Sequence, residues 1–387
     1  MTDTPTIHWM QDGAPRSARW RSEAGLPAPQ RVVVADDATS ADAAYRLACE
    51  GHALCWQGDF QNARQLLQAM ARRCDTKPKP KRKGPPVPSS PVEVFHRHRM
   101  AQAQRARILG ALLVPLAADY TVPLRRPPEV QAACTEAWGP PDLAAQEGSV
   151  VSLRELQAVV GAHEWRKKGV PIPALGGRIH PHYGVFSPVR GEYIDLVAAA
   201  PLPPALKKHP LAVDVGTGTG VLAALLARRG VAQVIATDRD PRALACAREN
   251  VARLELAAQV EVREADLFPE GRAALVVCNP PWVPAKPSSP VEHAVYDPDS
   301  RMLRGFLAGL AARLVEGGEG WLILSDLAEH LGLRSRSELE TWIAAAGLRV
   351  ADRKDILPRH GKVADTDDPL HAARAAEITS LWRLVAA

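Results

Sequence analysis

The sequence has no long uninterrupted hydrophobic run. Its longest apolar stretch, Ile108 to Ala118, contains Gly110 and Pro115 and is too short to span a bilayer. The first five residues have neither the basic start nor the apolar segment of a signal peptide. We therefore expect a cytoplasmic protein with no membrane partner.

Cysteine is also sparse. The six cysteines include no CxxC pair and form no dense framework, which is typical of reduced thiols and argues against a zinc site. We accordingly expect no metal. The chain shows no internal repeat, so a solenoid is excluded.

The net charge of +5 is unevenly distributed. Residues 72–107 hold eleven Lys/Arg and two acids, which leaves about −4 on the rest of the chain. Residues 76–91 combine this charge with six prolines, the composition of a basic linker. Two interpretations stay open: a solvated linker, or an arm that binds the phosphates of RNA or DNA.

A length of 387 residues allows two or three domains. A helix is expected after Ser40, and a second one with Asp59 as its N-cap. Ahead of the linker we expect an irregular segment over residues 1–29 and a small, mainly helical module over 30–75. After it we expect a helical region and connector over 92–175, and the main domain over 176–387.

The main domain alternates short apolar strands with helices. This pattern predicts an α/β fold with a doubly wound, mostly parallel, seven-stranded Rossmann-like sheet and a smaller, mainly helical N-terminal region. The expected strands are 211–215, 233–237, 259–263, 274–278 and 320–325, with two more near 348–352 and 379–385.

A glycine turn lies at the centre of this pattern. An apolar strand ends at Asp214, glycines follow at 216, 218 and 220, and an apolar helix begins at Val221. Glycines leave room for the backbone to approach an adenosine-type cofactor closely. A nicotinamide dinucleotide site would instead need GxGxxG, and Asp214 would repel its pyrophosphate. The acid suits a ligand with an ammonium group, as in S-adenosylmethionine.

Two further acids follow at the spacing that such a cofactor needs. Asp238 ends the second strand, twenty-two residues after Gly216. At this spacing a carboxylate can accept hydrogen bonds from both ribose hydroxyls. Asp266 follows the third strand and suits an adenine amino group, with Leu267 against the ring face.

Asn279-Pro-Pro-Trp282 follows the fourth strand and suits methylation of a planar nitrogen. Such a nitrogen is a poor nucleophile because its lone pair is delocalised. The Asn279 side-chain oxygen and the Pro280 carbonyl can accept its two hydrogens, and the prolines make the turn rigid. Trp282 can stack on a planar substrate group.

Together these motifs resemble the class I S-adenosylmethionine-dependent methyltransferases. Asp214 to Gly220 is similar to their first motif, and 279–282 to the fourth motif of the amino-methylating branch. Within that branch the chain looks most like the N(5)-glutamine methyltransferases that modify release factors and ribosomal proteins. Residues 188–193 stand where those enzymes have a proline–arginine–proline–glutamate loop, and residues 294–305 resemble the stretch after their fourth motif.

The resemblance implies cofactor contacts at Asp214, Gly216, Asp238 and Asp266 and substrate amide contacts at Asn279 and Pro280. The full set of candidates is Asn279, Pro280 and Trp282 as catalytic residues, Asp214, Gly216, Thr217, Gly218, Gly220, Asp238, Asp266, Leu267 and Asn279 for the cofactor, and Phe186, Pro188, Arg190, Glu192 and Pro281 as a substrate loop. This chain departs from the family at Trp282, where those enzymes have tyrosine, and at Val189 and Gly191.

Three functions remain open. The first is S-adenosylmethionine-dependent methylation of a glutamine side chain in a translation protein. The second is methylation of a base amine in RNA or DNA, with residues 72–107 holding phosphate. The third is a non-catalytic binding module. A monomer is favoured, but the sequence does not determine the oligomeric state.

Overall fold

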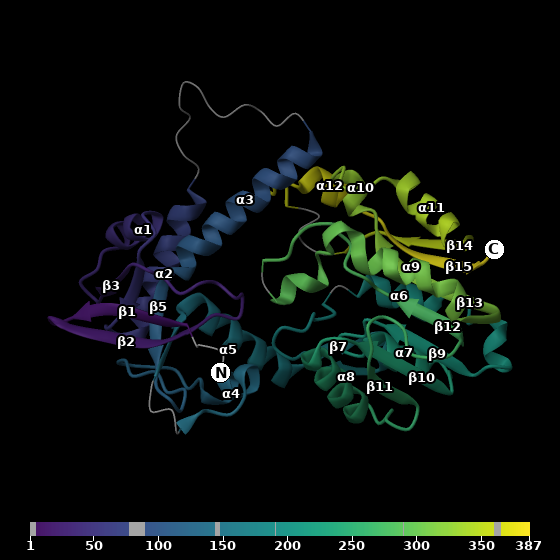
Figure 1. Cartoon of the computed structure of the whole chain (residues 1–387), viewed down its shortest axis with the longest axis horizontal. Helices are drawn as coiled ribbons and strands as arrows, with labels where there is room; N and C mark the ends of the chain where they lie inside the picture. Colours follow the sequence, from purple (N-terminus) through teal and green to yellow (C-terminus); the bar gives the residue numbers. More distant parts are fainter. Residues whose placement is uncertain (1–4, 77–89, 144–147, 190, 289, 360–364) are drawn as a thin grey trace. The chain divides into compact units, whose positions relative to one another are not determined.

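The computed structural model describes residues 5–76, 90–143, 148–189, 191–288, 290–359 and 365–387. The chain separates into two units (Figure 1). The first comprises the described residues of Met1–Val87 and Arg97–Glu164, and the second those of Pro88–His96 and Trp165–Ala387. In the described part of the chain, no helix is long and apolar enough to cross a membrane.

The first unit is built on a sheet with strand order β1-β2-β6-β5-β4-β3. Its strands are β1 (Thr6–Gln11), β2 (Ala14–Arg21), β3 (Val32–Ala35), β4 (Ala53–Trp56), β5 (Leu112–Leu116) and β6 (Ser149–Ser152). Strands β3, β4 and β5 run parallel, whereas β1 pairs antiparallel with β2. The accompanying helices are α1 (Ala41–Cys49), α2 (Phe60–Asp75), α4 (Gln131–Trp138), and the larger parts of α3 (Pro91–Gly110) and α5 (Leu153–Lys168).

The expectation that residues 1–29 are irregular is wrong, because β1 and β2 form a hairpin there. Its turn is Asp12-Gly13, with both residues at positive φ. This dipeptide is a strong hairpin signal when flanked by alternating apolar residues. Ile7 and Trp20 are both buried in one cluster with Leu113 of β5, so tertiary contacts hold the hairpin.

The expectation of a mainly helical N-terminal region did not include the sheet that accompanies its helices. Ser40 and Asp59 cap the N-termini of α1 and α2, but strand β4 lies between these two helices in the sequence. All four residues of β4 are buried, and a short apolar run of this kind has no period that separates strand from helix. The apolar stretch at 108–118 divides at Gly110, where α3 ends and β5 follows. Most of the expected linker, residues 77–89, lies outside the described residues.

The second unit confirms the α/β fold with a largely parallel sheet. Its described residues form a seven-stranded sheet of order β11-β10-β9-β12-β13-β15-β14, in which only β15 pairs antiparallel with its neighbours. The strands are β9 (Leu211–Val215), β10 (Gln233–Asp238), β11 (Val260–Glu264), β12 (Ala273–Cys278), β13 (Leu314–Ser325), β14 (Leu348–Ile356) and β15 (Thr379–Ala386). A separate two-stranded pair, β7 (Val170–Ile172) and β8 (Gly177–Ile179), precedes them.

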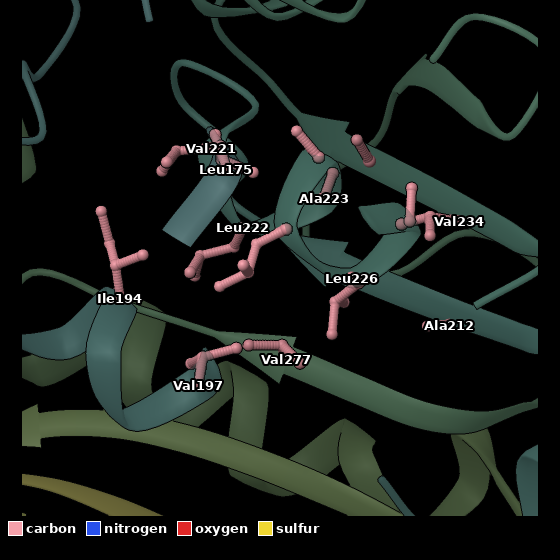
Figure 2. Packing of buried hydrophobic residues seen from close by; sticks show 14 of the residues in the cluster. Leu175, Ile194, Val197, Ala212, Val221, Leu222, Ala223, Leu226, Val234 and Val277 are labelled. Atoms are coloured by element: carbon pink, nitrogen blue, oxygen red, sulfur yellow. The ribbon is translucent and has the colours of Figure 1, made fainter. Parts of the chain in front are cut away.

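Helices cover this sheet through two buried apolar clusters. The helices are α6 (Glu192–Ala199), α7 (Val221–Arg228), α8 (Pro241–Arg253), α9 (Arg301–Arg313), α10 (Leu327–His330), α11 (Arg336–Ala345) and α12 (His371–Ala376). Figure 2 shows Leu222 and Leu226 of α7 packed near Val197 of α6 and Val277 of β12. Every residue of α7 from Val221 to Ala227 is buried, which fixes the helix directly after the glycine turn.

Candidate active site

The candidate residues follow the carboxyl ends of four neighbouring parallel strands. Val215 of β9 pairs with Thr237 of β10 on one side and with Cys278 of β12 on the other. Asp238 of β10 in turn pairs with Glu264 of β11. The glycine turn, Asp238, Asp266 and Asn279 therefore emerge at one edge of the sheet, where open α/β sheets bind ligands.

The glycine turn has the backbone that its sequence predicts. Gly216, Gly218 and Gly220 have φ of +71°, +55° and +81°, conformations that strain any other residue. The Thr217 N–H donates to the Thr237 carbonyl at 2.8 Å, which fixes the turn to β10. A Cβ at Gly216 would come within 2.5 Å of the Met302 Cε, so little free space lies over that glycine.

Asp214 stabilises this turn through hydrogen bonds to its buried side chain. It is 1% exposed, and its Oδ2 accepts hydrogen bonds from the Thr217 hydroxyl at 2.6 Å and the Ala223 N–H at 3.0 Å. Burial raises the pKa of Asp214 to about 6, against the lowering effect of these two bonds. The carboxylate thus holds the turn to the start of α7, a role that the sequence analysis did not assign to it.

Asp238 joins two turns at the same edge. Its Oδ2 accepts from the Gly218 N–H at 3.0 Å, and its Oδ1 accepts from the N–H groups of Arg239 and Asp240. These bonds orient the carboxylate at the end of β10. The glycine turn and the acid are therefore coupled directly.

Asp266 and Leu267 point in different directions. The Asp266 side chain is 73% exposed and lies 3.9 Å from the Arg239 guanidinium. Leu267 has a positive φ of 73°, its carbonyl accepts from the Thr237 hydroxyl, and a Cβ on Gly305 would lie 2.8 Å from its Cδ1. Its side chain thus packs toward α9.

Asn279 and Trp282 form a hydrogen-bonded pair. The Trp282 indole N–H donates to the Asn279 Oδ1 at 2.9 Å. The Trp282 ring packs against three apolar clusters of the second unit and is partly buried. Pro280 is buried and Pro281 is half-buried. The tryptophan is therefore a fixed support for the asparagine, which the expectation of a stacking surface did not include.

The candidate substrate loop is only partly turned outward. Phe186 is half-buried and Pro188 is buried, while Arg190 lies outside the described residues. Glu192 is 8% exposed, and its Oε1 accepts from the Arg359 backbone N–H. The Glu192 carboxylate is therefore buried and hydrogen-bonded to another part of the chain.

Two buried polar residues at the site were missed from the sequence. Asn250 of α8 is 1% exposed; its Nδ2 donates to the Thr219 carbonyl at 3.1 Å, and its Oδ1 accepts from the His180 N–H at 2.7 Å. The signal was present, because Asn250 falls on the apolar stripe of its helix. Asp297 is 6% exposed and accepts from the N–H groups of Met302 and Leu303 at the start of α9.

Three carboxylates surround the end of β12. Burial, together with Asp214, Asp297 and Asp238, raises the pKa of the Cys278 thiol well above its ordinary value. This negative environment beside the glycine turn favours a cationic ligand over an anionic one. Among the described residues, no cluster of His, Cys, Asp and Glu has the composition of a metal site.

Part of the chain is similar to known methyltransferases. Residues 176–336 match the methyltransferase small domain family. A release factor glutamine methyltransferase from Cereibacter sphaeroides is 43% identical over 112 residues, 28% of this chain and 36% of the relative. Another from Deinococcus radiodurans is 35% identical over 165 residues, 39% of this chain and 56% of the relative. The ribosomal protein L11 methyltransferase of Symbiobacterium thermophilum is 30% identical over 140 residues, 36% of this chain and 40% of that protein.

The matched region is therefore similar to the methyltransferase small domain and to part of the glutamine methyltransferases. The chain spans between about a third and just over half the length of these relatives. Their matched segments amount to less than half of this chain, so what they act on bears on this protein only by analogy.

Proposed function

We propose that the second unit transfers a methyl group from S-adenosylmethionine to a planar amide nitrogen, and that the acceptor is a glutamine side chain of a translation protein. The names of the relatives, which include release factor and ribosomal protein methyltransferases, support the acceptor class. The register that sets Cys278 beside Val215 is the observation that carries the proposal, since it brings Asn279 next to the glycine turn.

The residues present fit this cofactor. The turn at 216–220 offers backbone without side chains, and the acids near Cys278 suit a cationic ligand. Gly216, Thr217, Gly218 and Gly220 would line the nucleoside and amino-acid parts, with Asp238 facing the ribose hydroxyls and Asp266 the adenine. When bound, S-adenosylmethionine supplies an electrophilic methyl group on a sulfonium.

Asn279 and Pro280 prepare the acceptor nitrogen. The Asn279 Oδ1 accepts one hydrogen bond from Trp282 and keeps a second lone pair, which can accept a hydrogen bond from the N–H of the substrate amide. The Pro280 carbonyl accepts the other hydrogen. Held by both hydrogens, the nitrogen would direct its lone pair at the methyl carbon. A new C–N bond would form as the C–S bond of the sulfonium broke, and one N–H proton would leave to solvent.

The nucleic-acid alternative gains little from the described part of the basic segment. Arg73 forms an ion pair with Asp42, and Arg105 one with Asp75, so both guanidinium groups already have carboxylate partners. We therefore keep base methylation as an outcome of the test. The non-catalytic alternative is tested by the same assay.

The test is labelled methyl transfer by the full chain into an extract of its own cells, followed by protease or nuclease. We expect the label to be lost with protease and to map to a glutamine. Asn279→Ala should reduce turnover by at least about a hundredfold, because the acceptor loses its orientation, with cofactor affinity retained. Asn62→Ala, an asparagine of the first unit, is the matched control. Loss of the label only with nuclease would show that the acceptor is a nucleic acid and not a protein. The absence of any label would favour a non-catalytic binding module.

A further inference from the structure

The first unit contains a pocket that the proposed reaction does not use. Its volume is about 240 Å³. The lining residues all belong to the first unit and include Arg19, Arg21, Tyr120, Trp138, Asp142 and Ser149. The pocket combines two guanidinium groups with two aromatic rings.

Arg21 is held by aromatic faces. Its guanidinium carbon lies 4.5 Å from the Trp138 ring centroid and 5.4 Å from that of Tyr120. The two rings meet edge to face with centroids 5.8 Å apart, and the Tyr120 hydroxyl donates to the Gly139 carbonyl at 3.3 Å. The charge is therefore fixed in one place by cation–π contacts.

Two hydrogen-bond donors on residues that line this pocket have no acceptor. The Arg21 Nε and the Trp138 Nε1 are buried, and neither has a partner among the described residues. Leaving a buried N–H unsatisfied costs about 1–3 kcal/mol, more when the group is charged. Two adjacent donors of this kind indicate a place for an acceptor.

The nearby acids do not provide that acceptor. Glu155 lies close enough to interact electrostatically with Arg21, but its Oε1 accepts from the Glu23 N–H at 3.0 Å. Asp142 lies 4.0 Å from Arg19 with a 64% exposed side chain. Within the described ranges Arg21 has no ion-pair partner.

We infer that this pocket binds an oxyanion. Two neutral or cationic N–H donors and a fixed positive charge suit a ligand that only accepts hydrogen bonds, and Arg19 at the wall adds a second charge. Phosphate and carboxylate share this chemistry. The site is independent of the methyltransferase reaction, since no residue of the second unit lines it.

The test is a titration of the full-length ¹⁵N-labelled protein with inorganic phosphate, and separately with acetate, at constant ionic strength. The Trp138 indole resonance, assigned by its loss in Trp138→Phe, reports binding. We expect a saturable shift, stronger with whichever anion the pocket prefers. Arg21→Gln should weaken binding at least about tenfold, because a charge-assisted hydrogen bond is lost. Arg16→Gln, on the exposed part of the same strand, should bind like the parent.

Several results would overturn the inference. These are a shift that never saturates, an equal response to chloride, or equal affinities of the Arg16 and Arg21 variants. If Arg21→Gln does not fold, Arg21→Lys serves instead, since it keeps the charge and removes Nε. Retained affinity in that variant, measured by calorimetry, would exclude Nε as a ligand donor.

Discussion

At Asn279, one hydrogen bond fixes the orientation of the side-chain amide that we propose binds the acceptor. A carboxamide has an oxygen and an NH2 group of nearly equal size, and only the oxygen can accept the hydrogens of a substrate amide. The Trp282 indole N–H donates to that oxygen at 2.9 Å and thereby fixes its position. Tyrosine, the residue of the resembled family, has no N–H at this point of the ring.

Trp282→Phe tests this orientation. The variant keeps an aromatic ring for the three clusters but loses the donor, so we expect methyl-transfer kcat to fall about three- to tenfold, the worth of one hydrogen bond. Cofactor affinity should stay unchanged. Steady-state kinetics with the identified acceptor and cofactor calorimetry measure both. Trp165→Phe, a 49% exposed tryptophan, is the control; an unchanged kcat in Trp282→Phe would contradict the orienting role.

Asp214 makes stability depend on pH in an unusual direction. Its pKa rises from 3.8 to about 6 on folding because the group is buried. The stability that it contributes is therefore full below pH 4 and is lost as the pH rises through 6. A shift of about two units corresponds to roughly 3 kcal/mol.

Asp214→Asn removes this dependence. We expect the free energy of unfolding of the parent, relative to the variant, to fall by roughly 3 kcal/mol between pH 4 and pH 7. Urea denaturation at each pH measures the difference, in which the other titrating groups cancel. A difference that rises with pH would mean that the buried carboxyl is not the cause.

At the scale of elements, helix α8 holds two loops in place through one side chain. Asn250 satisfies the Thr219 carbonyl in the glycine turn and the His180 N–H after β8. Asn250→Ala leaves both groups buried without partners, and we expect a loss of about 2–4 kcal/mol of stability with weaker cofactor binding. Urea denaturation and calorimetry measure these effects. Asn62→Ala, at a half-buried asparagine of the first unit, is the control. Equal effects of the two variants would contradict the proposed role of Asn250.

The elements also show where sequence patterns are ambiguous. The sequence predicts helix α7 clearly, because residues with helical apolar spacing directly follow a glycine turn. The sequence does not predict strand β4, because a run of four buried residues shows neither the alternation of a strand nor the spacing of a helix. The hairpin of β1 and β2 had its signal in Asp12-Gly13, but Ile7 and Trp20 of its strands are buried against Ala53, Leu113 and Val150 of other elements.

At the scale of the whole molecule, the two units have separate sheets and cores. We expect calorimetry to resolve two unfolding transitions, of which S-adenosylmethionine raises only the one from the second unit. At a hundred times the dissociation constant the stabilisation is about 2.7 kcal/mol. Asp238→Ala should keep both transitions and lose most of the shift. A single transition that moves as one would show that the units unfold together.

The sequence by itself determined the strand–glycine turn–helix unit, the α/β class of the second unit and the candidate residues at its strand ends, because these depend on local spacing and on glycine's freedom at positive φ. Only the tertiary structure decided that Asp214 braces the turn, that Trp282 holds Asn279, and that Arg21 and Trp138 share a pocket. Each of these contacts depends on which side chains are buried together. Burial is a property of the packed chain, and no local pattern records it.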